Sequence, residues 1–232
     1  MALIGTAGWV IPAQYKAEFP ATGTQLERYA ARLTAVEINS SFYRPHQQKT
    51  YVRWAASVPE HFRFSLKLPR TITQDKRLRD CDSELARFRD EIAGLGSKLG
   101  VVLAQLPPSL VFDAGVARDF FPRLHDMAAI ACEPRHASWF TPAADALLRK
   151  LHVMRVAADP PRAPADGAPG GWTGQAYWRL HGSPKIYYSD YPESALQALA
   201  PKLREHDWCI FDNTAAFAAL GNALQLIALR SV

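Results

Sequence analysis

The stretch Ala131–Trp139, A-C-E-P-R-H-A-S-W, lies near the middle of the chain and follows the apolar residues 128–131. In a strand, alternation would place Glu133 and Arg135 on one face and Cys132 on the other. Pro134 removes a backbone donor, so the strand should end there and the following residues should form a loop. This stretch predicts a strand that ends in a functional site, although an exposed edge strand with a surface salt bridge would show the same pattern.

Outward from this stretch, short apolar runs alternate with segments of helical periodicity along the chain, which is typical of parallel α/β architecture. Besides the quoted stretch, we expect strands at residues 2–9, 35–42, 62–68, 101–106, 153–159, 176–181 and 208–211. We expect helices at residues 24–33, 48–58, 83–95, 117–124, 142–151, 193–205 and 215–229. A proline- and glycine-rich segment, residues 160–174, predicts a long irregular loop in place of one crossover helix and a mobile lid over the site.

The polar residues within the strands favour a (β/α)₈ barrel over a doubly wound open sheet. Inner strands of an open sheet meet helices on both faces and are continuously apolar, whereas the second, third, fifth and seventh expected strands each have one polar face. A barrel interior that ends in a site would accommodate these residues. The sequence has no G-x-G-x-x-G or G-K-[ST] loop after any strand. We therefore predict a single (β/α)₈ domain over residues 1–232.

The composition indicates which ligands, structural frameworks and cellular locations are compatible with this sequence. The 232 residues include 27 basic and 22 acidic side chains, a net charge of +5 that favours an anionic ligand without indicating a dedicated nucleic-acid surface. The three cysteines have neither disulfide-framework nor zinc-ribbon spacing. No apolar run is long enough to span a membrane, and the first residues lack the features of a signal peptide. We expect a cytoplasmic protein with no membrane association.

Seven short motifs, in order along almost the whole chain, resemble the YecE-like family, also called domain of unknown function 72. They are G-T-A-G-W at Gly5–Trp9, V-E-I-N-S-S-F-Y at Val36–Tyr43, F-S-L-K-L-P-R at Phe64–Arg70, Q-L-P-P at Gln105–Pro108, E-P-R-H-A-S-W at Glu133–Trp139, Y-W-R-L-H-G at Tyr177–Gly182 and F-D-N-T at Phe211–Thr214. The resemblance implies a TIM-barrel-like fold and locates a site, but it implies no reaction. The segment Thr71–Gln74, T-I-T-Q, differs from the corresponding segment of relatives, in which the last residue tends to be histidine.

Active sites of such barrels lie at the C-terminal ends of the strands, where this chain has most of its polar motif residues. We expect four catalytic residues, namely Glu133, Glu37, His181 and Lys67. We expect substrate-binding roles for Trp9, Asn39, Tyr43, Gln105, Arg135, His136, Trp139, Arg179, Tyr188, Asp212 and Asn213. The aromatic members would stack against a ring, sugar or base. The charged members could also neutralise one another as a purely structural network.

Three functions fit these residues. The favoured one is a metal-independent enzyme without a cofactor, in which Glu133 or Glu37 transfers protons while lysine and arginine hold a small phosphate- or carboxylate-bearing substrate. The second is a phosphodiesterase or isomerase with a divalent metal held by Glu133, Asp159, His181 and Asp212. Neighbouring cations would repel such a metal. The third is non-catalytic binding of nucleic acid. The sequence leaves the oligomeric state open.

Overall fold

The structure, a computed structural model, describes residues 1–161 and 167–230. Its strands form one sheet in the order β7-β9-β10-β1-β2-β3-β4-β5-β6-β8, and only the last pair is antiparallel. The strands are β1 Leu3–Ala7, β2 Ala35–Ile38, β3 Arg63–Lys67, β4 Leu99–Gln105, β5 Ala129–Glu133, β6 Val153–Arg155, β7 Ala157–Asp159, β8 Gly170–Gly171, β9 Tyr177–Leu180 and β10 Trp208–Phe211. The parallel order follows the chain, as a (β/α)₈ barrel requires.

One chain segment joins the two ends of the sheet. β6 pairs with β5, and β7 pairs with β9 on the far side. Only Val156 separates the two strands, and its backbone N–H donates to Cys132 O at 2.9 Å. The strand expected at residues 153–159 is therefore broken, because its two halves pair with different neighbours. With these halves taken as one strand, and two-residue β8 as an addition, the eight expected strands form a nearly closed barrel.

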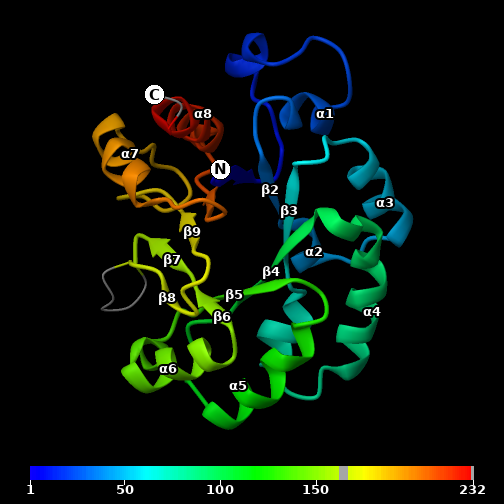
Figure 1. Cartoon of the computed structure of the whole chain (residues 1–232), viewed down its shortest axis with the longest axis vertical. Helices are drawn as coiled ribbons and strands as arrows, with labels where there is room; N and C mark the ends of the chain where they lie inside the picture. The colour runs from blue at the N-terminus through cyan, green and yellow to red at the C-terminus, as the bar shows by residue number, and fades with distance from the viewer. Residues whose placement is uncertain (162–166, 231–232) are drawn as a thin grey trace.

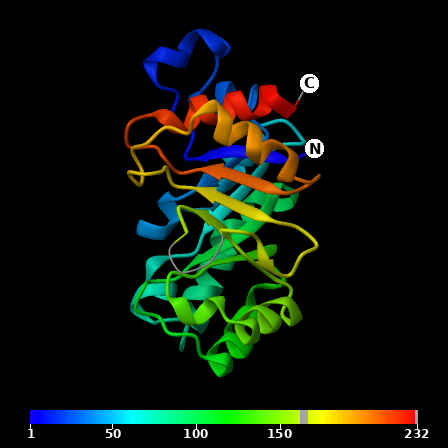
Figure 2. The ribbon, with the colours of Figure 1, turned by 90° about the vertical axis from the view of Figure 1, so that its left-hand side faces the viewer.

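Helices cover the outside of the barrel, as Figure 1 shows. The α-helices are α1 Gln25–Ala30, α2 Ser40–Tyr43, α3 Gln48–Ala56, α4 Asp82–Ile92, α5 Ala114–Phe120, α6 Pro142–Lys150, α7 Glu193–Leu199 and α8 Ala218–Arg230. Shorter turns are the 3-10 helices η1 Ala13–Glu18, η3 Ala93–Lys98, η4 Phe121–Leu124, η5 Ala137–Phe140 and η6 Ala200–Lys202, and the π-helical η2 Thr71–Asp75. Figure 2 shows α8 on the outside of the sheet beside β1, and it packs on β1, β10 and α7. None of the described helices has the length and apolar character needed to cross a bilayer.

The alternation expected from the sequence is confirmed in the packing. Ala35, Val101, Ala131, Tyr177 and Ile210 belong to a small buried cluster inside the barrel. Side chains of the opposite parity join the larger core between sheet and helices, including Val36, Val102, Ile130, Leu180 and Phe211. Inward positions at the C-terminal ends of the same strands carry the charged residues. The barrel interior therefore has a layer of apolar side chains, which we call the floor, below a polar C-terminal opening, which we call the mouth.

The second strand is shorter than expected. The prediction of a strand over residues 35–42 is wrong after Ile38, where the chain turns into the short helix α2. Ser41 holds this turn, because its Oγ donates to Ile38 O at 3.0 Å and to Lys67 O at 2.7 Å. A side chain that bonds backbone carbonyls offers the chain an alternative to the sheet ladder. The turn ties the end of β2 to the end of β3 at the mouth.

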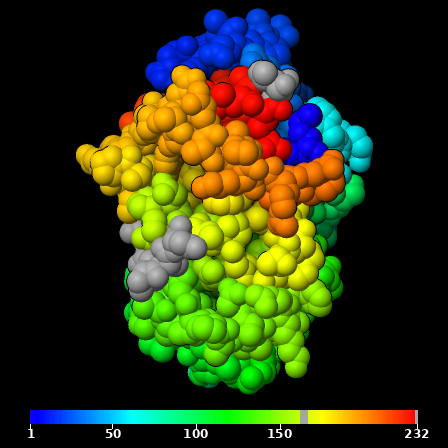
Figure 3. Space-filling model, turned by 60° about the vertical axis from the view of Figure 1, so that its left-hand side comes forward, coloured from blue at the N-terminus to red at the C-terminus, as the bar shows by residue number. Residues whose placement is uncertain are grey.

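The described part of the connection between β7 and β9 contains no helix, as the sequence predicted. In Figure 3 the yellow surface that includes β8 and β9 lies between the yellow-green surface of α6 and the orange surface of α7. The expectation that residues 160–174 lack any regular pairing is wrong at β8, because Gly171 pairs with Met154 and Gly170 with Arg155. Residues 162–166 of the predicted lid lie outside the described residues.

Glycine is required where β4 passes the barrel floor. The register of β3 and β4 shifts opposite Gly100, and a Cβ at this residue would lie 2.4 Å from Trp208 Cζ2. Trp208 is 1% exposed and stacks on Tyr177 with ring centroids 5.8 Å apart, so it has little room to move.

We predict that Gly100→Ala lowers the free energy of unfolding by about 1–3 kcal/mol, because the added methyl overpacks the floor. Urea denaturation measures the change. The matched control is Gly115→Ala on exposed helix α5, where a Cβ would contact only Asp113 Oδ1 at 3.2 Å. Equal effects of the two substitutions would contradict the packing argument.

Candidate active site

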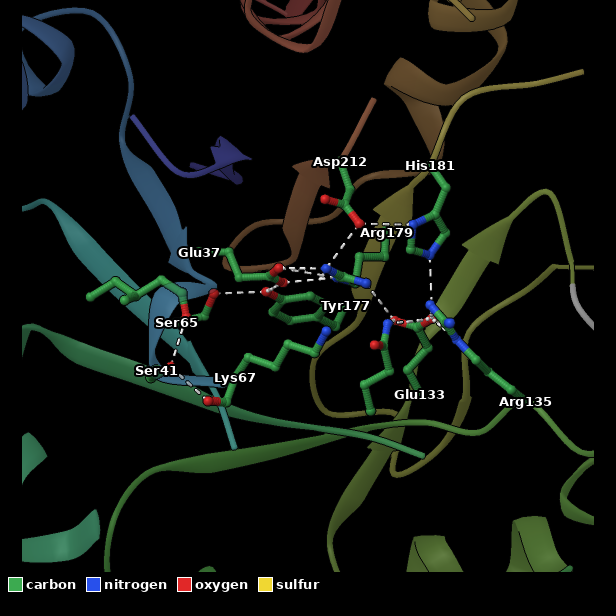
Figure 4. Close-up of polar contacts among 12 residues, drawn as sticks. Glu37, Ser41, Ser65, Lys67, Glu133, Arg135, Tyr177, Arg179, His181 and Asp212 are labelled. Atoms are coloured by element: carbon green, nitrogen blue, oxygen red, sulfur yellow. Dashed lines mark hydrogen bonds and ion pairs between the residues drawn. The ribbon is translucent and has the colours of Figure 1, made fainter. Parts of the chain in front are cut away.

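A buried network of charged residues lies at the C-terminal ends of the barrel strands. Figure 4 shows these side chains converging from β2, β3, β5, β9 and β10. The residues joined by direct contacts are Glu37, Gln105, Glu133, Arg135, Arg179, His181 and Asp212, and Lys67 points toward the same group. These eight were all predicted as site residues from the sequence. Because they lie far apart along the chain, only barrel closure brings them together.

Arg179 is the centre of this network and is 1% exposed. Its Nη2 donates to Glu37 Oε1 at 2.6 Å, and its Nη1 donates to Glu133 Oε2 at 2.8 Å. Nη2 also lies 3.1 Å from Asp212 Oδ2. Burial alone would lower the pKa of Arg179, but the three surrounding carboxylates raise it well above its ordinary value. One permanently charged guanidinium thus faces three carboxylates in a region with little water.

Glu37 supports Arg179 from beneath. It is fully buried, and its two oxygens accept three hydrogen bonds from Arg179 and one from Tyr177 Oη. A carboxylate has about four lone-pair positions, so these bonds leave Glu37 little capacity for a substrate. We infer a positioning role for Glu37, in contrast to the proton-transfer role considered from the sequence.

Glu133 is a second acceptor centre and is 1% exposed. Gln105 Nε2 donates to both of its oxygens at 3.1 Å, and Arg135 donates to Oε1 through Nε and Nη2 at 3.2 Å. Burial would raise the pKa of Glu133, but the charges of Arg179, His181 and Arg135 outweigh it and hold the pKa well below 4.5. A carboxylate stabilised in this way is a weak base.

His181 lies between two carboxylates and is fully buried. Its Nδ1 is 3.0 Å from Asp212 Oδ2, and its Nε2 is 3.3 Å from Glu133 Oε1 without the geometry of a hydrogen bond. Burial would lower the pKa of His181, but Glu133 and Asp212 raise it above 6.5. The two carboxylates therefore favour the protonated imidazolium, and its Nε2 faces Glu133 Oε1.

Lys67 differs from the other cations of the network. It is 7% exposed, and its Nζ lies 4.0 Å from the centroid of the Phe42 ring. Among the described residues its amine has neither a hydrogen bond nor an ion pair. Burial and the charge of Arg179 lower its pKa to about 8, although Glu37, Glu133 and Asp212 act in the opposite direction.

Of the four residues proposed from the sequence as a metal set, Glu133, His181 and Asp212 lie together, but Asp159 does not. In the register of β7 and β9, Asp159 pairs with outward-facing Leu180, whereas Ala158 pairs with inward-facing Arg179. Asp159 Oδ2 accepts from Tyr191 Oη at 2.6 Å on the helix side of the barrel. Nowhere in the described chain do three histidine, cysteine, aspartate or glutamate side chains form a group suited to a metal ion. The inward carboxylates instead surround Arg179.

The predicted aromatic residues do not contact the charged network. Trp9 packs edge-on against Trp54 with ring centroids 5.0 Å apart. Tyr43 is 73% exposed and Tyr188 is 50% exposed. Trp139 lies in the core between sheet and helices, where its Nε1 donates to Leu110 O at 2.8 Å. The structure places Trp139 away from the barrel mouth because β5 ends at Glu133 and the chain then turns outward.

Three further predicted residues have local structural contacts. His136 Nδ1 lies 2.8 Å from Ser138 Oγ at the start of η5. Asn213 Nδ2 donates to Ser189 O at 3.0 Å and to Asn222 Oδ1 at 2.9 Å. Asn39 begins α2, and the Oδ1 atoms of Asn39 and Asn213 are buried without a hydrogen-bond partner.

Residues outside the predicted set also support the network. Tyr177 Oη donates to Glu37 Oε2 at 2.8 Å and lies 2.7 Å from Ser65 Oγ. Both residues share strand parity with predicted site residues, so alternation could have found them. Gln74, from the segment that departs from the YecE-like pattern, donates through Nε2 to Gln105 O at 3.0 Å. Only the folded chain shows that Gln74 reaches the end of β4.

The fold and the charged strand ends define a TIM-barrel-like protein with a candidate site at the C-terminal mouth. The family model described as "Protein of unknown function DUF72" matches residues 3–231, and the chain belongs to this family. Among curated proteins, the chain is similar to UPF0759 protein YecE of Escherichia coli K12, with 33% identity over 84 residues. It is also similar to UPF0759 protein YunF of Bacillus subtilis, with 30% identity over 155 residues.

These curated matches are partial. The YecE match covers 36% of this chain and 31% of that protein, and the YunF match covers 61% of this chain and 53% of that protein. The chain thus aligns with about a third of YecE and about half of YunF.

Solved structures support the fold over the whole chain. A DUF72 family protein from Enterococcus faecalis V583 has a TM-score of 0.83 at 19% identity, covering 100% of this chain and 96% of that one. A DUF72 family protein from Thermotoga maritima MSB8 has a TM-score of 0.81 at 23% identity, covering 100% of both chains. A structure of D-psicose 3-epimerase with D-fructose has a TM-score of 0.53 at 10% identity, covering 98% of this chain and 95% of that one.

We predict that Glu133→Gln destabilises the protein by about 3 kcal/mol at pH 7, because it leaves cations in the network uncompensated. The folded pKa of Glu133 is depressed, so its stabilising contribution is complete above pH 4.5 and is lost as the pH falls further. The difference between parent and variant should therefore shrink below pH 4.5. Urea denaturation across this range measures it.

The control for this prediction is Glu205→Gln, which alters a surface ion pair whose glutamate side chain is 70% exposed. Because water screens that pair, the control should leave the urea midpoint unchanged. A stable Glu133→Gln variant with the pH profile of the parent would show that the network does not depend on this charge.

A second prediction concerns the protonation of histidine. His181 should titrate above pH 6.5, whereas His46 should titrate below 6.5 because burial and the charge of Arg44 lower its pKa. NMR titration of the imidazole protons measures both in one sample. Asp212→Asn should lower the pKa of His181 and leave that of His46 unchanged, and the reverse order of the two parent values would refute the electrostatic assignment.

Proposed function

We propose that the protein is a metal-independent enzyme that performs acid–base chemistry on a small substrate bearing a carboxylate or phosphate. The observation that carries the proposal is His181, a buried imidazole between Glu133 and Asp212. These carboxylates favour its protonated form, and its Nε2 lies 3.3 Å from Glu133 Oε1 without the geometry of a hydrogen bond. A buried donor of this kind is what general acid catalysis requires. Strongly perturbed pKa values together in a barrel mouth are also typical of catalytic sites.

The charges at the mouth favour an anionic substrate. The side chains of four basic residues, Lys67, Arg135, Arg179 and His181, face three carboxylates, those of Glu37, Glu133 and Asp212. Arg135 has the most accessible guanidinium of the network, with 17% of its side chain exposed. A guanidinium at the rim could pair with a carboxylate or phosphate in a bidentate manner.

The roles within the site follow from the hydrogen bonds. Glu37 and Glu133 hold Arg179 and His181 in place, because their oxygens are occupied by those residues and their neighbours. His181 donates a proton, and the Lys67 amine, which has a lowered pKa, accepts one in its neutral form. Arg179 stabilises the negative charge of the site and of a developing anion. No step of this chemistry needs a metal.

We predict that the parent protein catalyses proton–deuteron exchange at carbon next to the carbonyl group in some members of a panel of small oxo-carboxylates and phosphorylated ketones. The reaction is followed by proton NMR in D₂O with a chelator present throughout. His181→Gln should reduce the exchange rate at least about 100-fold, as expected for loss of a general acid. Arg135→Gln should instead raise the ligand concentration needed for half-maximal rate.

The panel includes neutral esters of the same compounds as matched controls, which should exchange no faster than in buffer alone. Exchange that is absent in the presence of the chelator and appears when Mn²⁺ is added in excess over it would overturn metal independence. Parent-like exchange in His181→Gln would overturn the assigned proton donor.

A further inference from the structure

Lys67 differs from the other buried cations because its amine has no direct ion-pair or hydrogen-bond partner among the described residues. Its Nζ faces the Phe42 ring at 4.0 Å. Lys98 is similarly enclosed, with 12% of its side chain exposed, but its Nζ donates to Ala55 O at 2.8 Å and to Val58 O at 2.6 Å. A lysine that served only to balance charge would lie against a carboxylate, as Lys76 lies 2.8 Å from Glu84.

The surroundings of Lys67 increase the fraction of its amine that is neutral. Burial and the positive charge of Arg179 both disfavour the ammonium form and bring the pKa to about 8, against the partly opposing charges of Glu37, Glu133 and Asp212. At pH 7.5 about a quarter of the amines are then unprotonated, compared with about one in a thousand for an ordinary lysine. Desolvation next to another cation is a recognised way to activate a lysine as a nucleophile.

We propose that Lys67 is a nucleophile that forms an imine with a small aldehyde or ketone bearing a carboxylate or phosphate. The side chain extends from the C-terminal end of β3 into the mouth, where Figure 4 shows its amine pointing toward Arg179 and the adjacent carboxylates. This inference deepens the proposed function and rests on it for the proton donor and the anion clamp. It adds covalent catalysis and restricts the substrate to a carbonyl compound.

The chemistry balances with groups already in the site. The Nζ lone pair of neutral Lys67 attacks the carbonyl carbon, and the carbonyl oxygen takes the proton from His181 Nε2 as its double bond becomes single. A proton moves from the new ammonium to His181, which gives a neutral carbinolamine. The carbinolamine hydroxyl then leaves as water with a proton from His181, and the nitrogen lone pair forms the protonated imine. The amine and the carbonyl compound thus give one imine and one water, with one proton taken up.

The test uses glyoxylate, a small aldehyde that carries a carboxylate, and sodium cyanoborohydride, which reduces a protonated imine to a stable secondary amine. We expect carboxymethylation of Lys67 at pH 7.5 at a rate at least about tenfold above that of any other lysine, as measured by mass spectrometry of peptides. The peptide containing Lys98 is the control for a buried but hydrogen-bonded amine, and that containing Lys76 for an ion-paired one. Lys67→Arg should abolish the modification and retain the positive charge.

A second measurement separates this inference from the proposed function. Glycolate has the same carboxylate as glyoxylate but no aldehyde group. It should slow the modification of Lys67 by competition. Its NMR signals should broaden in the presence of the parent protein but not in the presence of Arg135→Gln. If glycolate binds in this way while Lys67 is modified no faster than Lys76, the imine is wrong and the anion-binding site stands. If glycolate does not bind and Lys67 is unmodified, both proposals are wrong. Preferential modification of Lys67, suppressed by glycolate, supports both.

Discussion

The candidate site depends on one interaction, the burial of the Arg179 guanidinium among Glu37, Glu133 and Asp212. Three carboxylates at this spacing would repel one another and would be expensive to remove from water. The guanidinium can satisfy all three because its planar group presents several donors in fixed directions. Removing it would leave buried charges without a partner, so the whole arrangement exists only around this residue.

The barrel supplies the geometry for this interaction. Inward positions near the start of the strands are apolar and form a packed floor with residues such as Val101 and Trp208, whereas inward positions at the C-terminal ends of the strands are polar or charged. The floor excludes water from below and fixes Tyr177, whose hydroxyl group holds Glu37. An apolar floor beneath a charged mouth therefore strengthens the electrostatic interactions and stabilises their geometry.

Around Arg179, the network divides into groups with full hydrogen bonding and groups without it. Glu37 and Glu133 accept bonds at nearly all of their available positions, which suits residues that position others. His181 Nε2 and Lys67 Nζ lack hydrogen bonds, and their pKa values are shifted in opposite directions, upward for the imidazole and downward for the amine. A pair of groups whose surroundings bring their pKa values toward neutrality is suited to proton transfer. We therefore propose the chemical role for these two residues and a positioning role for the carboxylates.

The sequence by itself determined the parallel barrel and the inward face of most strands, because alternation is a local property that needs no tertiary contact. It also predicted a candidate site at the charged strand ends. Only the tertiary structure decided that Asp159 faces the helices and that Trp139 is a core residue, since a break at Val156 and a turn after Glu133 depend on pairing with distant strands. The sequence likewise could not predict the pKa of Lys67, because burial and charges from other strands set it.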